Sequence, residues 1–349
     1  MDESQDAPAR ASDDDDLAGR LGLTESLRPK KTRGRRALVI TLVLLLALLL
    51  AAGGVVAYFF FRINSAIDSL DRDPSLLPSS TASAPTSEAD NSPVTFVLMG
   101  SDSRSTEASE GRSDVLMVAY LSGDRSHVYL TSFPRDMWVA VPGYGQAKIN
   151  AAYAWGGPAL TVQTLESLTD VRMDHAVVID FEGFINLTTT LGGVTVDNKY
   201  ASSSNGYTFP QGQITLQGEE ALAYVRERYD LPNGDLDRAE RQRAVVSAII
   251  DKVVSPQVLT DPGTFGDVVD QVASCVTVDS GLTTDSVWSL ARSLKFTGSE
   301  GVRSLQAPIS GFGTSADGQA IDIVDEAGLA ELGQAMAGDT MDEYWQTHK

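Results

Sequence analysis

An uncharged apolar run of 25 residues, Ala37 to Phe61, limits most strongly what this chain of 349 residues can become. At about 1.5 Å per residue a helix of that length spans about 37 Å, which exceeds the hydrocarbon core of a bilayer at about 30 Å. Basic residues gather just before the run, between Lys30 and Arg36, so the N-terminus is expected to stay in the cytoplasm. The sequence therefore predicts a single-pass protein of the cell membrane, with everything after residue 61 outside.

A secretory signal peptide is the alternative for this run. The apolar stretch is longer than an ordinary signal core, and the 36 residues before it make an unusually long leader. The small residues at 51–54 leave the alternative open.

Composition divides the rest of the chain into a tail, a linker and a folded domain. Residues 1–36 are polar and carry both an acidic and a basic cluster, which is typical of a disordered cytoplasmic tail. Residues 62–93 contain eight Ser, two Thr and four Pro, which predicts a flexible extracytoplasmic linker. We expect one folded domain over residues 94–347, because no second linker follows Val254.

The charge balance excludes several classes of function. The net charge of −20 lies entirely beyond residue 61, where 39 acidic residues face 19 basic ones, so this domain should repel nucleic acid. A single cysteine, Cys275, excludes a disulfide scaffold and is expected to be a buried thiol. The three histidines show no metal-ligand spacing, so a histidine-based metal site is not expected.

Apolar strand patterns alternate with helical ones, which predicts a layered α/β domain. Strands are expected at 94–99, 115–121, 127–133, 175–181 and 302–308. Helices are expected at 148–155, 158–168, 182–191, 218–228, 236–254, 283–294 and 325–336.

Charged motifs follow the ends of these elements, where ligands bind in open α/β sheets. The pairs Asp102/Arg104 and Arg112/Asp114 flank one loop between two strands. Two carboxylates with few other protein ligands suit Mg²⁺, or Mn²⁺ in its place. Each Asp taken alone is equally typical of a turn.

The helix expected at 236–254 carries the sharpest signal. Val245, with Ala248, Ile249 and Val253, marks its buried stripe, and Arg238 and Gln242 extend this stripe toward the N-terminus. An inward guanidinium needs an anion, either a protein carboxylate or a ligand phosphate. Asp235 and Asp237 are expected as N-cap residues.

Arg226 and Arg228 point to the same ligand only if their helix ends near Arg226, because two residues apart means about 200° around a helix. Asn233-Gly234 makes a break plausible, and a solvated helix end is the alternative. Together, two carboxylates and several inward arginines describe a pyrophosphate pocket with a divalent ion, and hence phosphoryl transfer. Hydrolase, P-loop and zinc-protease motifs are absent from the sequence.

These motifs, in this order behind one apolar run, resemble the LytR-CpsA-Psr family. The pieces that carry the resemblance are FVLMGSDSR, GRSDVLMVAYL, SFPRDMWVAVPG, KINAAYAWGGP, LGGVTV, GEEALAYVRER and DLDRAERQ. The match is close from about Thr95 to Val254. The family implies a three-layer α/β/α sandwich with a mixed sheet and a polyprenyl chain in an apolar groove.

The resemblance also implies an activity and residue roles. A phosphotransferase would move an anionic glycopolymer from a polyprenyl-pyrophosphate carrier to peptidoglycan through a phosphodiester. Asp102 and Asp114 would hold Mg²⁺. Asp235 would orient the arginines or transfer a proton. Five arginines would bind the pyrophosphate, namely Arg112, Arg135, Arg226, Arg228 and Arg238. Gln242 would support the head group. Two further cations, Arg104 and Lys148, would contact the anionic substrate. Family members often have Gly where this chain has Asp237.

Two alternatives stay open. A pyrophosphatase would hydrolyse the same lipid carrier with water as the acceptor. A non-catalytic envelope regulator, of the kind once named a transcriptional attenuator, would bind without turnover. The acidic external domain and the absence of a helix-turn-helix pattern in residues 1–36 argue against a DNA-binding regulator.

Overall fold

The structure is a computed structural model, and it describes residues 50, 53–55, 57–79, 92–101, 113–296 and 298–349. The expected cytoplasmic tail and most of the apolar run lie outside these residues. Among the described residues, none of the helices combines the length and the apolar character that crossing a membrane requires. The chain divides into two units, Met1–Tyr58 and Phe59–Lys349, and the fold below is that of the second.

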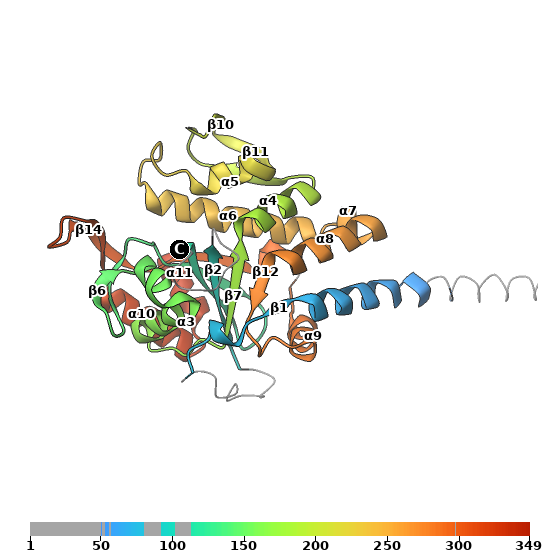
Figure 1. The fold of residues 1–349 in the computed structure, drawn as a ribbon, viewed down its shortest axis with the longest axis horizontal. Helices are drawn as coiled ribbons and strands as arrows, with labels where there is room; N and C mark the ends of the chain where they lie inside the picture. Colours follow the sequence, from blue (N-terminus) through green and yellow to red (C-terminus); the bar gives the residue numbers. More distant parts are fainter. Residues whose placement is uncertain (1–49, 51–52, 56, 80–91, 102–112, 297) are drawn as a thin grey trace, which may run out of the picture. The chain divides into compact units, whose positions relative to one another are not determined.

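A mixed seven-stranded sheet forms the centre of this unit (Figure 1). Its strands follow one another in the order β1 (Asp71–Arg72), β12 (Val276–Val278), β7 (His175–Asp180), β2 (Val94–Ser101), β3 (Ser113–Leu121), β4 (Val128–Ser132) and β13 (Val302–Gln306). The β2–β7 and β4–β13 pairs are parallel, whereas β3 is antiparallel to both neighbours. The five strands predicted from apolar runs are all present, which confirms an α/β fold.

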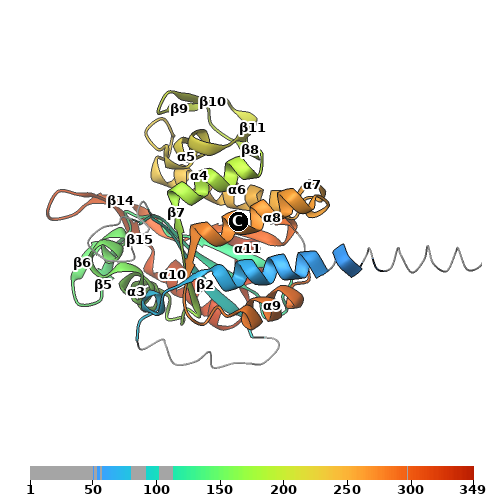
Figure 2. The same ribbon diagram turned by 45° about the vertical axis from the view of Figure 1, so that its right-hand side comes forward.

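Helices cover both faces of the sheet (Figures 1 and 2). On one face lie α3 (Asn150–Thr169), α10 (Glu326–Ala337) and α11 (Met341–His348). On the other lie α4 (Phe181–Thr190), α5 (Gly218–Arg226), α6 (Asp235–Val253), the short α7 (Pro256–Leu259) and α8 (Pro262–Cys275). Strands such as β3 are therefore buried from both sides, which explains their continuous apolar sequence.

Four hairpin-like pairs lie outside the central sheet, and none was predicted. They are β5 (Trp138–Val141) with β6 (Gly145–Lys148), β8 (Val194–Asn198) with β11 (Gly212–Leu216), β9 (Ser202–Ser204) with β10 (Tyr207–Phe209), and β14 (Ile309–Thr314) with β15 (Ala320–Val324). Two of them matter for the site, because β15 packs on β5 directly after the Arg135 turn.

The break expected between two helices at 148–155 and 158–168 is a kink within α3. Gly156 and Gly157 have non-helical backbone angles, and Gly157 has a φ of 65°. Pro158 follows and has no N–H to donate to the preceding turn. The two helical patterns thus lie on either side of a defined bend.

Residues 59–79 belong to the folded unit, so the predicted boundary at Val94 is too late. Helical residues 57–69 lead to β1 and the 3₁₀ turn η1 (Pro74–Leu76), and Leu76 is fully buried in the core. Phe59 packs edge-on against Phe265 of α8, and Arg62 pairs with Asp270 at 2.7 Å. The polar composition concealed the few apolar anchors, and the described part of the expected linker is therefore structured.

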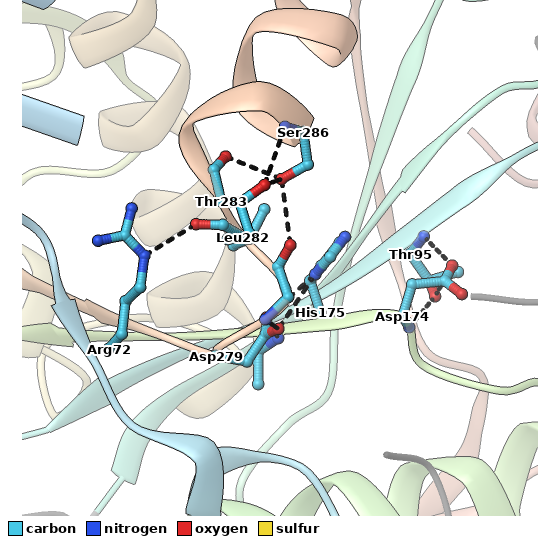
Figure 3. Close-up of polar contacts among 10 residues, drawn as sticks. Arg72, Thr95, Asp174, His175, Asp279, Leu282, Thr283 and Ser286 are labelled. Carbon is cyan, nitrogen blue, oxygen red and sulfur yellow. Dashed lines mark hydrogen bonds and ion pairs between the residues drawn. The ribbon is translucent and has the colours of Figure 1, made fainter. Parts of the chain in front are cut away.

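A polar cluster fastens this N-terminal segment to the sheet (Figure 3). Asp279 accepts hydrogen bonds from the backbone N–H groups of Ala176 and Gly281, and its Oδ2 lies 3.1 Å from His175 Nδ1. Arg72 Nε donates to the Leu282 carbonyl at 3.1 Å, just before α9 (Thr284–Ser293). These bonds join β1, β7 and the loop after β12 at the end of the sheet where β2 and β7 begin.

Candidate active site

A cationic cavity of about 270 Å³ opens where β3 begins and α5 ends. It is lined by four arginines, one glutamine and two valines, namely Arg135, Arg226, Arg228, Arg238, Gln242, Val115 and Val225. These cations come from the turn after β4, the end of α5 and the first turn of α6. The structure thus brings together five of the residues that the sequence selected.

The end of α5 explains how both arginines of the Arg226-Glu227-Arg228 motif reach this cavity. The helix stops at Arg226, and Glu227 adopts an extended backbone with φ −66° and ψ 134°. Glu227 is buried and accepts hydrogen bonds from the N–H groups of Tyr229 and Asp230, which fixes the turn. The hypothesis that the helix ends here is confirmed.

The first turn of α6 supplies Asp235 and Arg238. Gly234 precedes it with a φ of 53°, and no side chain caps the helix. The N-cap prediction for Asp235 and Asp237 is wrong: Asp235 is the first helical residue, and Asp237 accepts hydrogen bonds from the Asn233 backbone and side-chain amide at 2.8 and 3.1 Å. The glycine at the cap leaves Asp235 free to turn toward the arginines.

Asp235 connects two arginines of the cavity. One of its oxygens lies 2.5 Å from Arg238 and 3.7 Å from Arg135. Arg238 is only 5% exposed, as its place on the apolar stripe predicted. The Asp235 carboxylate is an anion that compensates its charge. Burial is the largest influence on Asp235 and raises its pKa, while the arginines act in the opposite direction.

Gln242 lies one turn deeper and confirms the predicted inward face. It is buried, and its side-chain amide donates to the Val225 carbonyl at 3.1 Å. Val245 is fully buried below it, while Ala248, Ile249 and Val253 are partly buried against the same core. The bond from α6 to the end of α5 holds the two walls of the cavity at a fixed separation.

An apolar cavity of about 70 Å³ adjoins the cationic one. The two share Val115, Val225 and Gln242. Its other walls come from β2, β3, β7, α4 and α6, through Leu98, Met99, Gly100, Met117, Ile179, Phe184, Val245 and Val246. The strands at 115–121 and 175–181 therefore line an apolar groove with some of their side chains and pack in the core with others.

Lys148 lies beside the cationic cavity rather than in its wall. Its ammonium group is 2.8 Å from Asp136, the residue after Arg135. Ile149 donates its backbone N–H to the Met137 carbonyl, so the end of β6 is fixed to the Arg135 turn. This places a further cation near the cavity, already paired with a carboxylate.

Asp322 is a site neighbour that the sequence reasoning missed. It lies on β15, donates its backbone N–H to the Asp136 carbonyl at 2.9 Å, and is only 5% exposed. Burial, together with the negative charges of Asp235 and Asp136, raises the pKa of Asp322 to about 6. The only signal in the sequence is a carboxylate between two isoleucines, Ile321 and Ile323.

Two cations that the sequence analysis did not select, Arg241 and Arg243, are structural. Arg241 stacks on the Tyr224 ring at 4.3 Å and donates to Asn198 Oδ1 and the Tyr200 carbonyl, which ties α6 to β8. Arg243 donates to the Ser132 hydroxyl, and burial lowers its pKa to about 10. On the rim, Arg228 donates to the hydroxyl of Tyr229, whose ring is 84% exposed.

The predicted metal ligands are only partly within the described chain. Asp102, Arg104 and Arg112 lie outside it, and Asp114 lies on β3 with its side chain not described. Within the residues that the structure describes, no three His, Cys, Asp or Glu side chains gather in a way that would hold a metal. The backbone does bring Ser101 at the end of β2 opposite Ser113 at the start of β3.

The arrangement suits one kind of ligand. Arginine forks bind phosphoryl oxygens, and an apolar groove next to them accepts a hydrocarbon chain. A molecule with a pyrophosphate joined to a long lipid satisfies both cavities at once.

Comparison with known proteins agrees with this geometry. Residues 59–338 match the model of the LytR_cpsA_psr family. The chain is 36% identical over 243 residues to the polyisoprenyl-teichoic acid–peptidoglycan teichoic acid transferase TagU of Bacillus subtilis, covering 69% of this chain and 76% of that protein. It is 35% identical over 241 residues to TagU of Bacillus licheniformis, with the same coverage of 69% and 76%.

Solved structures show the same fold. The crystal structure of B. subtilis TagV aligns with a TM-score of 0.60 at 28% identity, over 71% of this chain and 97% of TagV. The structure of TagT bound to LIIa-WTA aligns with a TM-score of 0.59 at 26% identity, over 75% of this chain and 98% of TagT. The family model covers most of the described fold and every residue of both cavities, and the chain is therefore a member of the LytR_cpsA_psr family.

Proposed function

We propose that this chain is a phosphotransferase that moves an anionic glycopolymer from a polyprenyl-pyrophosphate carrier to peptidoglycan, forming a phosphodiester. The observation that carries the proposal is the junction of the two cavities at Val115, Val225 and Gln242. It matches the chemical junction of the donor, where a lipid ends and a pyrophosphate begins. The names of the TagU relatives, and a related TagT structure bound to LIIa-WTA, support the same substrate class.

The residues of the cationic cavity have distinct tasks in this reaction. Arg226, Arg228 and Arg238 bind the pyrophosphate oxygens, and Arg135 neutralises charge that develops as the bond to the leaving lipid phosphate lengthens. Gln242 lies where phosphate gives way to lipid and orients the head group through its fixed amide. Asp235 holds Arg135 and Arg238 in register.

A divalent cation is part of the proposal. Asp102 and Asp114 would hold Mg²⁺, or Mn²⁺ in its place. Arg112 would join the arginines on the pyrophosphate, and Arg104 and Lys148 would contribute positive charge to the anionic substrate. The pairing of Ser101 at the end of β2 with Ser113 at the start of β3 supports this, because the two aspartates directly follow these residues in the sequence and carboxylate oxygens are ligands that Mg²⁺ prefers. When bound, it supplies charge neutralisation at the phosphoryl oxygens.

The proposed setting is extracytoplasmic. The apolar run at 37–61 would anchor the chain in the cell membrane, and a three-layer α/β/α domain would face the wall. Both substrates, the lipid carrier and peptidoglycan, are then within reach of one site.

The test uses the whole chain in a neutral detergent, with a polyprenyl-pyrophosphate-linked disaccharide, soluble peptidoglycan fragments and Mg²⁺. Wild type should form a metal-dependent phosphodiester adduct. Arg238→Ala should reduce the rate by about 10²-fold or more, as expected for a lost charge-stabilising group. Arg292→Ala is the matched control, because this arginine is exposed and lies over Trp288 on α9.

The products decide between the alternatives. A sugar phosphate without an acceptor adduct would identify a pyrophosphatase instead. Tight lipid binding without turnover, unaffected by Arg238→Ala, would contradict an enzymatic role and leave a binding protein or regulator.

A further inference from the structure

Three acidic residues lie at or beside the Arg135 turn, and two of them are paired with cations. Asp235 is paired with Arg238 and Arg135, and Asp136 is paired with Lys148. Asp322 forms no ion pair with any described residue, and its buried Oδ2 has no hydrogen-bond partner there. Burying a carboxyl group without an ion pair or a hydrogen bond lowers the stability of the fold. Such a group beside this site therefore indicates a role in function.

The backbone holds Asp322 in this position. Its N–H donates to the Asp136 carbonyl, and the bridge between Met137 and Asp322 continues the contact of β15 with β5. The opposite side chain on β14 is Phe312, which is 67% exposed, so the hairpin presents an open face next to a buried acid. Asp322 is therefore fixed by strand pairing rather than by an ion pair.

We propose that Asp322 is a positioning residue for proton transfer, whose negative charge acts on Asp235 and enables Asp235 to accept the proton of the acceptor hydroxyl. The inference rests on the proposed function. Asp235 is the carboxylate next to the cationic cavity, because both of its arginines line that cavity. Asp322 lies behind it and acts through it.

The physical reason is the balance of charge around Asp235. Burial raises the pKa of Asp235, but its two guanidinium partners stabilise the anion and so weaken it as a base. A second carboxylate nearby opposes the arginines and lets the two acids bind one proton more tightly than Asp235 would alone. Acid–base catalysts are often pairs of carboxyl groups whose pKa values are driven apart by their surroundings.

Charged groups face this pair from the neighbouring elements. Asp235 faces Arg238 on its own helix, Arg135 and Asp136 on the turn after β4, and Arg228 beyond α5. Asp322 faces Asp235, Asp136 and Lys148. The pKa of Asp322, raised to about 6, agrees with a pair that is ready to accept a proton at neutral pH.

The proposed transfer forms one bond to phosphorus and breaks another. The acceptor oxygen forms a bond to the phosphorus that carries the sugar, and the bond from this phosphorus to the bridging oxygen breaks. The hydroxyl proton passes to Asp235, and the electron pair of the broken bond leaves with the polyprenyl phosphate. The proton is then released to solvent, so no oxidant, reductant or further reactant is needed.

The experiment compares Asp322→Asn with wild type in the transfer assay, across pH 4.5 to 8.5. Asparagine has the same shape and removes only the charge. We expect kcat to fall about 10- to 100-fold with the KM for the donor unchanged, and the acidic limb of the kcat profile, near pH 6 in wild type, to move to lower pH. Asp322→Glu, which keeps the charge, should retain that limb. Asp317→Asn, on the exposed turn of the same hairpin, is the matched control.

Each result has one meaning. An unchanged kcat and pH profile in Asp322→Asn would overturn the proposal, and so would a rise in donor KM with an unshifted acidic limb, since that is the mark of a purely structural residue. If wild type itself forms no adduct, the proposed function fails and the inference fails with it. Adduct formation by wild type with an unaffected Asp322→Asn rejects only the inference.

Discussion

At the scale of single residues, the site shows how one carboxylate can be satisfied and its neighbour left uncompensated. Asp235 has two arginines, whereas Asp322 has only a backbone anchor for its strand. The arginines that line the cavity were identifiable from sequence, because an inward arginine on an apolar stripe demands an anion. Asp322 was not, because its neighbours come from α6 and the β4–β5 turn, far away in sequence.

The unpaired acid predicts an unusual dependence of stability on pH. The folded pKa of Asp322 is about 6, above its ordinary 3.8, so the neutral form favours the fold. That stabilisation is complete at pH below about 4 and is lost as the pH rises through about 6. Asp322→Asn should therefore raise the free energy of unfolding at pH 7.5 by about 1 kcal/mol, after allowing for screening by solvent, and should not raise it at pH 4.

Thermal unfolding of wild type and Asp322→Asn at pH 7.5 and at pH 4 measures this change in stability. A gain in Tm that is equal at both would contradict the titration of Asp322, whatever its cause. Asp317→Asn on the exposed turn should give no gain at either pH.

Tyr229 makes a second prediction at this scale. Arg228 donates to its hydroxyl at 2.9 Å and lies over its ring at 4.8 Å, so the ring holds the guanidinium toward the cavity. Tyr229→Phe keeps the ring and removes the acceptor. We expect the KM for the lipid-linked donor to rise about 3- to 10-fold, the value of one hydrogen bond to a charged group in a solvated setting. Tyr207→Phe, on β10 away from the cavity, should leave the KM unchanged.

At the scale of elements, sequence patterns predicted what is long and apolar and missed what is short and polar. Five strands of the central sheet and the helices α4, α5, α6, α9 and α10 were predicted, and so was the end of α5 at Arg226, whereas the short strands β1 and β12 were missed. Strand β9 consists of three serines, so nothing in its sequence separates it from a loop. Strand β11 does alternate polar and apolar residues, but only over Gln213 to Leu216, which is too short a pattern to predict a strand. The helix α8 also went unpredicted, although Asp261 caps it and Pro262 begins it.

The start of α6 depends on a glycine. Gly234 has φ 53° and ψ −110°, a conformation that residues with a Cβ rarely adopt. The nearest atom to an added Cβ is the Arg228 carbonyl oxygen at 3.8 Å, so the cost is one of backbone strain rather than of collision. Gly234→Ala should lower the free energy of unfolding by about 1 to 3 kcal/mol and displace Asp235 and Arg238.

Two measurements separate these effects. Denaturant unfolding gives the stability, and donor binding at a temperature where both proteins are folded gives the displacement. Gly263→Ala near the start of α8, where the glycine φ is ordinary and the nearest atom is 3.7 Å away, is the control. Unchanged stability and binding in Gly234→Ala would show that the turn tolerates another geometry.

At the scale of the whole molecule, the folded unit begins well before the sequence indicated. Residues 59–79 contribute a helix, the edge strand β1 and a buried leucine, and the family model also starts at residue 59. Composition predicted a linker there because Ser and Pro outnumber the apolar anchors. The three-dimensional role of Leu76 cannot be read from such a window, because its contacts are made by α3 and the distant core.

A chain that begins at residue 94 should therefore be less stable than the full protein. It loses Leu76, which is fully buried, together with Ala66 and Ile67 and the pairing of β1 with β12. We expect a loss of about 3 kcal/mol or more, since each large apolar side chain contributes about 1.5 to 3 kcal/mol when buried. Unfolding of the full chain, the truncated chain and Leu76→Ala checks this, and equal stability of all three would restore the predicted boundary at Val94.

The attachment of residues 59–79 has a mechanical consequence. If the part of the apolar run before Phe59 is held in a membrane while the pocket holds a growing wall polymer, the domain is under tension. The pull enters at Arg62–Asp270 and at the stack of Phe60 on Trp288, and then passes through β1 into β12 and β7. Arg135 follows β4, three strands farther across the sheet from β7, on the side away from this load. The attachment of residues 59–79 and the arginine cavity thus lie on different parts of the sheet, so a force on the attachment does not act first on the cavity.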